Sequence, residues 1–303
     1  MTEGKSIGFV GLGNMGAPMA RRLAQGGFPV LGHDLRAETT AALADAEAGI
    51  EAAAELGDLG KACGIVITML PDAAVVRQVV LGDAGLAETL ARGSVVIDMS
   101  SSAPGATVAL GAALQDLGIV LVDAPVSGGV PRARDGSLTI MAGGAPTTIA
   151  ELEPVFACLG QVQRCGDLGS GHAMKALNNY VSAAGLLAVC EALIIARRFG
   201  LDPQVVNAVL KCSTGRNNTT DRKVEQFMLN RAFDSGFALG LLRKDVGLAR
   251  DLAAELDLDA PWLQACEGLL EEAAQALGGA ADHTEALAFL EDRLAAKAQA
   301  AKP

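Results

Sequence analysis

The sequence predicts an α/β protein in two parts: a doubly wound parallel sheet, then an all-helical C-terminal domain joined to it by a long interdomain helix. Two observations lead to this prediction. From residue 6 to about 165, short β-type runs alternate with alanine-rich helical segments, an alternation typical of parallel strands with helices on both faces. After about residue 165 the β-type runs end and long helical stretches follow. We therefore predict domains at 1–165 and 166–303.

Each element follows from its local pattern. The expected strands cover residues 6–10, 29–33, 64–69, 94–98, 119–123 and 138–142, with helices such as 38–48 and 104–117 between them. The expected C-terminal helices cover residues 170–199, 203–210, 221–229, 239–256, 260–277 and 284–298. The helix at 170–199 is apolar nearly all round, as expected of a helix buried between domains or subunits. This pattern favours a homodimer or homotetramer.

Composition excludes several classes of protein. The chain has 303 residues, 50% of them apolar, which suits two domains with sizeable cores. Its net charge of -11 opposes binding to nucleic acid or to anionic membranes, so an anionic ligand needs local positive groups. Six cysteines and three histidines show no metal-ligand spacing, so no metal is expected. No secretory signal is recognised at the start of the sequence, and we expect a cytoplasmic protein with reduced thiols.

The first expected strand runs directly into a GxGxxG pattern. Gly11 suits the tight turn, Gly13 lets the backbone approach a pyrophosphate, and Gly16 lets the following helix lie close to the strand. Unpaired N–H groups at the helix N-terminus favour phosphate. We predict a Rossmann-type dinucleotide site made by Gly11, Leu12, Gly13, Asn14, Met15 and Gly16. The alternative is an ordinary strand-to-helix turn.

Asp34 ends the second expected strand, 18 residues after Gly16. A carboxylate there can accept hydrogen bonds from both ribose hydroxyls of the adenosine and would repel a 2′-phosphate, which favours NAD over NADP. Arg36 keeps NADP open because it could pair with that phosphate. The alternative is that Asp34 only caps the next helix.

Two later segments carry groups suited to a small carboxylate substrate. Ser127, Gly128 and Gly129 follow a strand at its C-terminal end, where a hydroxyl and bare N–H groups could form a carboxylate nest; the alternative is a simple turn. Lys175 and Asn179 lie one turn apart on the long apolar helix. A partly buried lysine suits proton transfer to or from a hydroxyl, whereas a lysine extending to solvent is the alternative.

Lys244 and His172 are two further polar residues near the same predicted cleft. Lys244, followed by Asp245, is a candidate second positive group, with a surface lysine as the alternative. A histidine at the start of a helix, as His172 is, is more often a hydrogen-bonded structural residue than a catalyst. We therefore do not expect His172 to be the catalytic base.

Four segments in this order resemble the β-hydroxyacid dehydrogenase family over nearly the whole chain. They are the dinucleotide loop GFVGLGNMGAPMA, the substrate loop DAPVSGG, the GxxxKxxNN segment and the late KD pair. The resemblance implies that Met69, Leu70 and Pro71 line the adenosine side and that Ser101, where threonine is usual, lies beside the nicotinamide. Ala238 stands where several members carry a basic residue, which weakens the transfer of any one substrate.

The resemblance also implies a reaction. Hydride would pass between a small 3-hydroxy acid, such as 3-hydroxyisobutyrate, or its semialdehyde and NAD or NADP. Lys175 would move the hydroxyl proton, the loop at 127–129 would hold the carboxylate, and Asn179 would orient the hydroxyl or the lysine. Lys244 would add positive charge near the substrate and the nicotinamide, and so belongs to the cofactor-binding residues. L-threonate dehydrogenase and tartronate semialdehyde reductase activities remain alternatives. Lys175 argues against an imine reductase and the short length against a decarboxylating phosphogluconate enzyme; an idle NAD-binding regulator is the alternative of another class.

Overall fold

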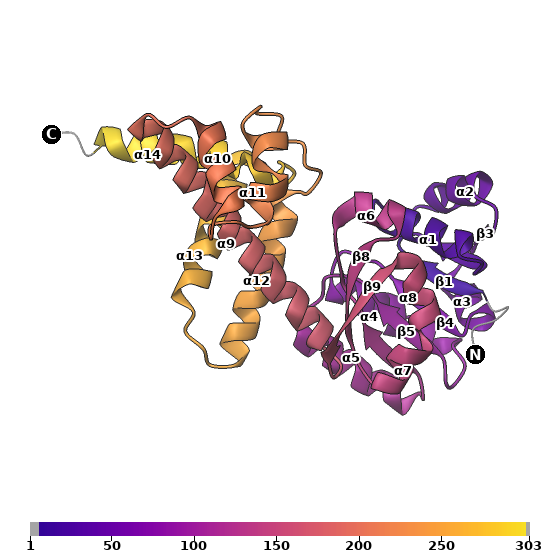
Figure 1. Ribbon diagram of the computed structural model, residues 1–303. Coiled ribbons are helices and arrows are strands. Elements are labelled where there is room, and N and C mark those ends of the chain that lie inside the picture. The colour runs from indigo at the N-terminus through magenta and orange to yellow at the C-terminus, as the bar shows by residue number, and fades with distance from the viewer. Residues whose placement is uncertain (1–5, 301–303) are drawn as a thin grey trace. The chain divides into compact units, whose positions relative to one another are not determined.

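The computed structural model describes residues 6–300, and the chain divides into two compact units after Lys175. The first unit contains a nine-stranded sheet and the second is helical (Figure 1). The strand order is β3-β2-β1-β4-β5-β6-β8-β7, with β9 paired to β8. This confirms the predicted fold class. The strands are β1 (Ile7–Val10), β2 (Val30–His33), β3 (Ile50–Ala52), β4 (Ile65–Thr68), β5 (Val95–Asp98), β6 (Val120–Asp123), β7 (Val126–Ser127), β8 (Leu138–Gly143) and β9 (Gly160–Gly166).

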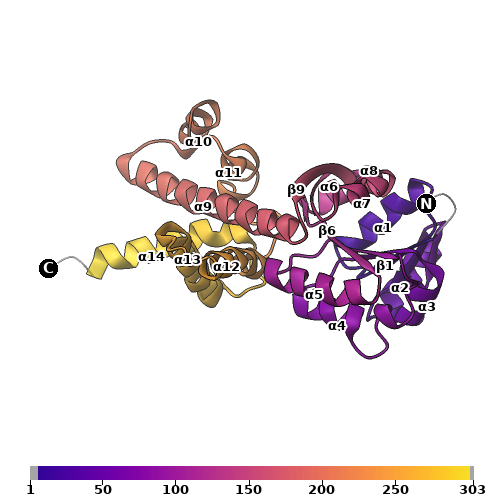
Figure 2. The ribbon, with the colours of Figure 1, turned by 90° about the horizontal axis from the view of Figure 1, so that it is seen from below.

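Helices cover both faces of the sheet. Alternate residues of a strand point to opposite faces, and here both sets are apolar, so each face is buried against helices. Phe9 and Ile97 pack with α1 and with α6 to α8, whereas Val66 and Val96 pack with α3 to α5. Figure 2 shows α4 and α5 on one side of the sheet and α6 to α8 on the other. The helices are α1 (Gly16–Gln25), α2 (Ala37–Ala46), α3 (Leu56–Ala62), α4 (Ala73–Leu81), the 3₁₀ turn η1 (Leu86–Glu88), α5 (Pro104–Asp116), α6 (Gly129–Asp135), α7 (Pro146–Glu151) and α8 (Glu153–Leu159).

The last residues of four central strands form one row across the sheet. Val10 of β1 pairs with Thr68 of β4, Thr68 with Asp98 of β5, and Asp98 with Asp123 of β6. These strands are parallel, so their carboxyl ends meet at one edge. Ligands of doubly wound sheets bind at this edge.

Three strands were missed by the sequence patterns, and one pairing differs from a purely parallel sheet. The missed strands are short or polar: β3 has three residues, β7 has two, and β9 has glycine at both ends with two glutamines and an arginine between them. β8 runs antiparallel to β6 and β7. The only helix between β7 and β8 is the seven-residue α6, too short for the crossover that parallel pairing needs.

The helical unit is built around α9 (Ser170–Phe199), which begins in the first unit and continues into the second. Leu186 and Cys190 of α9 share a buried core with residues of the later helices. Those are α10 (Pro203–Cys212), α11 (Asn218–Arg222), the π-helix η2 (Val224–Met228), α12 (Leu239–Glu255), α13 (Pro261–Leu277), the 3₁₀ turn η3 (His283–Glu285) and α14 (Ala286–Ala300). The single helix expected at 221–229 is therefore two short ones. By length and composition α9 could cross a membrane, but half of its most apolar window is buried.

Candidate active site

The glycine loop after β1 has the close contacts that its spacing predicts. Gly11 has φ +94°, and a Cβ there would collide with the carbonyl oxygen of Met69. A Cβ at Gly16 would collide with the carbonyl oxygen of Gly11, so α1 packs directly on the turn. At Gly13, by contrast, nothing lies within 4 Å of a Cβ position. This bare, exposed backbone before a helix N-terminus fits the phosphates of a dinucleotide.

Asp34 holds the same loop from the end of β2. Its Oδ2 accepts a hydrogen bond from the Leu12 N–H at 2.8 Å, and its Oδ1 accepts one from the Arg36 N–H at 3.0 Å. The N-cap residue of α2 is Arg36, and it makes no side-chain capping bond. Asp34 is therefore tied to the glycine loop and is not the cap of α2. The Arg36 guanidinium is mostly exposed, with its Nε 3.8 Å from Asp34 Oδ1.

The loops after β4 and β5 are joined beside the glycine loop. The Met69 N–H donates to the Val10 carbonyl at 2.9 Å, and the Leu70 N–H donates to the Ser100 hydroxyl at 2.9 Å. Pro71 is exposed and Ser101 half-buried at this edge of the sheet. The structure thus brings together the loops of the first unit that carry predicted cofactor residues, whereas Lys244 lies on the helical unit. Ser100, which the sequence analysis did not single out, is the hydroxyl that links them.

Asp98 anchors the ends of β4 and β5. The Thr68 hydroxyl and the Ser100 N–H both donate to its Oδ1 at 3.0 Å, and the Ser102 hydroxyl donates to its Oδ2 at 3.1 Å. The carboxylate is almost fully buried, so these donors replace the water it loses.

Asp123 anchors the first turn of α9. Its Oδ1 accepts from the Gly169 N–H and its Oδ2 from the His172 N–H, both at 2.8 Å. These N–H groups have no partner within the helix, and a carboxylate also suits the positive end of the helix dipole. Asp123 is four residues before Ser127, and His172 is three before Lys175. One buried carboxylate therefore fixes the start of the predicted substrate loop and the turn that leads to the predicted catalytic lysine.

His172 is a buried, hydrogen-bonded histidine, as the sequence predicted. Its Nδ1 lies 2.8 Å from the Thr107 hydroxyl and its Nε2 lies 3.1 Å from the Ser100 carbonyl. Both ring nitrogens are thus engaged, and the ring lies within 4 Å of the Asp98 and Asp123 carboxylates. This arrangement leaves the ring no free nitrogen for substrate.

The predicted substrate loop has positive backbone φ angles at two positions, and both are glycines. Gly128 has φ +133° and Gly129 has φ +68°, where side chains are disfavoured. Ser127 ends β7 half-buried, whereas both glycines are exposed at the start of α6. Lys175 is half-buried on α9 at the end of the first unit. The chemical roles of the substrate loop and of Lys175 stay predictions.

The helical unit holds the other two predicted residues. Asn179 is buried on α9, and its amide Nδ2 donates to Oδ2 of Asp245 at 2.6 Å. The other oxygen of Asp245 lies 3.6 Å from the Lys244 Nζ on α12. Asp245 therefore links Asn179 and Lys244. Asp245 is predicted from the sequence only as part of the KD pair, and its bond to Asn179 is visible only in the structure.

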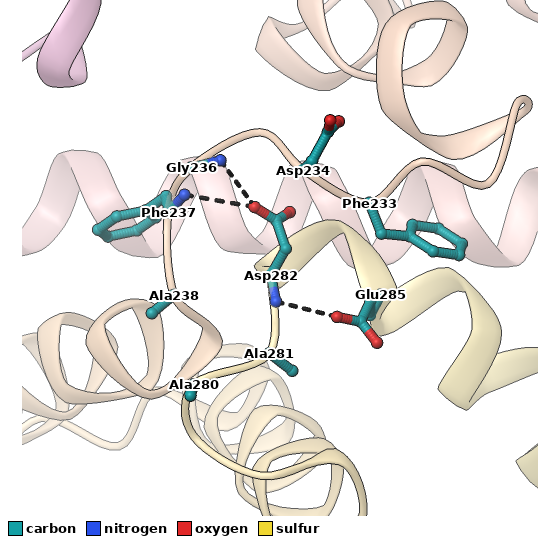
Figure 3. A pocket seen from close by; sticks show the side chains of 9 residues that line it. All are labelled: Phe233, Asp234, Gly236, Phe237, Ala238, Ala280, Ala281, Asp282 and Glu285. Carbon is teal, nitrogen blue, oxygen red and sulfur yellow. Dashed lines mark hydrogen bonds between the residues drawn. The ribbon is translucent and has the colours of Figure 1, made fainter.

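A pocket of about 450 Å³ opens elsewhere in the helical unit, between the 233–238 segment and the turn before α14 (Figure 3). It contains none of the predicted site residues, although Ala238 lines it. Asp282 accepts hydrogen bonds from the Gly236 N–H at 2.9 Å and the Phe237 N–H at 3.3 Å. Burial opposes ionisation of Asp282, but hydrogen bonds from neighbours including His283 and Thr284 hold its pKa well below the usual range. The Asp282 carboxylate thus links the 233–238 segment to the turn before α14 through hydrogen bonds. No metal-binding group of side chains occurs among residues 6–296, whose side chains the structure describes.

Comparison with known proteins gives family matches over both parts of the chain. Residues 6–169 match the NAD binding domain of 6-phosphogluconate dehydrogenase, and residues 169–290 match the NAD-binding domain of NADP-dependent 3-hydroxyisobutyrate dehydrogenase. The chain is 35% identical to 2-(hydroxymethyl)glutarate dehydrogenase of Eubacterium barkeri over 86% of each sequence. It is 33% identical to 2-hydroxy-3-oxopropionate reductase of Escherichia coli over 94% of this chain and 97% of that one.

A solved structure extends the likeness to three dimensions. The 3-hydroxyisobutyrate dehydrogenase of Mycobacterium tuberculosis, determined with L-serine, has a TM-score of 0.86 and 30% identity, covering 94% of this chain and 99% of that one. The fold, the glycine loop and these matches define an NAD(P)-dependent oxidoreductase acting on CH–OH groups. Within that class, the chain belongs to the β-hydroxyacid dehydrogenase family.

Proposed function

We propose that this enzyme interconverts a 2-substituted 3-hydroxypropanoate and its semialdehyde. The compounds named for its relatives are 2-(hydroxymethyl)glutarate, 2-hydroxy-3-oxopropionate and 3-hydroxyisobutyrate. All three have a carboxylate, an oxygen on C3 and a variable group on C2. The observation that carries the proposal is Asp123, which ties the start of the substrate loop to the turn before Lys175.

Each role follows from the chemistry of the residue. Ser127, Gly128 and Gly129 would bind the shared carboxylate through a hydroxyl and backbone N–H groups. Lys175 would take the C3 hydroxyl proton during oxidation and return it during reduction. Asn179, held by Asp245, would orient the hydroxyl or the lysine, and Lys244 would add positive charge near the substrate.

The glycine loop and Asp34 would hold the cofactor. A bound nicotinamide dinucleotide supplies the hydride acceptor for oxidation and the donor for reduction. Asp34 would accept hydrogen bonds from the adenosine ribose, and its negative charge opposes a 2′-phosphate at the same place. We therefore propose NAD as the preferred cofactor.

A substrate panel tests both proposals. We expect NAD(H)-linked turnover of at least one of 3-hydroxyisobutyrate, L-threonate, D-glycerate, L-serine, 2-(hydroxymethyl)glutarate and the short aldehyde acids, followed at the nicotinamide absorbance band. The value of kcat/KM should be about tenfold or more higher with NAD(H) than with NADP(H), a difference of roughly 1.4 kcal/mol. A preference for NADP(H) would contradict the role of Asp34. Cofactor binding without turnover of any compound would favour the idle regulatory protein.

We also propose a soluble cytoplasmic homodimer or homotetramer. Large apolar side chains on α9 and α10 are more than half exposed: Val181, Ile195, Phe199, Val205 and Val209. Light scattering at micromolar concentration should give a mass of two or four chains. The double variant Ile195→Glu, Phe199→Glu should give monomers, whereas Leu117→Glu, on the first unit, should not. A monomeric wild-type protein would contradict this proposal.

A further inference from the structure

The side chain of Arg132 lies across the predicted substrate loop. Arg132 is four residues after Gly128, on α6, and helical side chains lean toward the helix N-terminus. A Cβ placed at Gly128 would lie 2.8 Å from Cβ and 3.0 Å from Cγ of Arg132. The aliphatic stem of the arginine, from Cβ to Cδ, therefore covers Gly128.

The guanidinium is available for a ligand. Arginines such as Arg216, Arg243 and Arg293 on the helical unit pair with carboxylates at 2.7–3.0 Å. Arg132 is exposed, and among residues 6–296, whose side chains the structure describes, it has neither a hydrogen bond nor an ion pair through its side chain. The nearby acid Asp135 instead accepts from the Ser137 N–H at 3.0 Å. The space beside the neighbouring glycine is open as well, since a Cβ at Gly129 would meet only Pro131, at 3.8 Å.

We propose that Arg132 determines specificity by binding a second carboxylate, carried on the C2 substituent, so that the preferred substrate is a dicarboxylic 3-hydroxy acid. The inference rests on the proposed function, which assigns the shared carboxylate to Ser127 and the two glycines. A chain with a net charge of -11 repels a dianion at long range, so a dianion needs a local cation. The planar guanidinium suits this role because it can bind a carboxylate through two parallel N–H donors.

Two substrates that differ only on C2 provide the test. 3-Hydroxyisobutyrate carries a methyl group there, and 2-(hydroxymethyl)glutarate carries a carboxyethyl group. We expect the wild type to have the higher kcat/KM for the dicarboxylate. Arg132→Ala should lower that value about 10- to 100-fold, mainly through KM, and change the value for the monocarboxylate less than about threefold. Arg132→Lys should retain part of the preference, and added salt should reduce it.

Arg134→Ala is the matched control. Arg134 is also exposed on α6. It follows Arg132 by two residues, so its side chain is rotated about 200° around the helix axis from that of Arg132. It should leave the preference unchanged. Three results for Arg132→Ala would overturn the inference: equal losses of kcat/KM for both substrates, no loss for either substrate, or a rise only in the KM of NAD. Each of these results would leave the proposed function standing. A wild type that oxidises neither substrate nor any other compound of the panel would overturn both.

Discussion

Lys175→Ala should lower kcat by about 10² to 10⁴ while the affinity for cofactor stays nearly intact. The physical reason is that the alcohol cannot lose hydride from C3 readily unless a base takes the hydroxyl proton. The dinucleotide contacts predicted here belong to other segments, so binding of NADH, measured by fluorescence titration, should change little. Steady-state turnover of the preferred substrate gives kcat.

A second substitution separates proton transfer from charge. Arginine at position 175 keeps the positive charge but does not lose its proton in proteins. Lys175→Arg should therefore be about as inactive as Lys175→Ala. Lys211→Ala, at a partly exposed lysine paired with Glu225 on the helical unit, is the control and should be fully active. Near-normal turnover of either variant at position 175 would exclude Lys175 as the proton-transfer group.

The periodic elements of this chain could be predicted because their pattern is local. The α9 helix occupies the predicted range of residues 170–199, and both ends of each of the six predicted strands agree to within one residue. The close packing of Gly16 could also be predicted, because its contact is with the backbone of Gly11, only five residues earlier.

The remaining features depend on contacts between distant segments, which a local pattern does not encode. β9 is a polar edge strand formed by pairing with β8, and η2 interrupts a sequence with ordinary helical periodicity. Ser100 and Asp245 became visible only through their partners, Leu70 and Asn179. The sequence predicts polar side chains at the strand ends, but their hydrogen-bond partners could be identified only from the folded structure.

Asp123→Ala should have the largest effect on stability. The carboxylate is fully buried and accepts the N–H groups of Gly169 and His172 at 2.8 Å each. Its removal would leave two buried donors without an acceptor and a void beside the His172 ring. A buried donor left without an acceptor costs about 1–3 kcal/mol, and this substitution leaves two. We therefore expect the free energy of unfolding of the first unit to fall by about 2–6 kcal/mol.

Denaturant unfolding followed by circular dichroism would measure this loss, and the amide variant would identify its cause. Asp123→Asn keeps the shape but offers one carbonyl oxygen, so its amide N–H₂ would face one of the two backbone donors. Its loss should be substantial but smaller than that of Asp123→Ala. Asp116→Ala, on the exposed end of α5, should change stability by less than about 0.5 kcal/mol. If Asp123→Ala were as stable as Asp116→Ala, the first turn of α9 would be held by other contacts, and the link between the substrate loop and Lys175 would lose its physical basis.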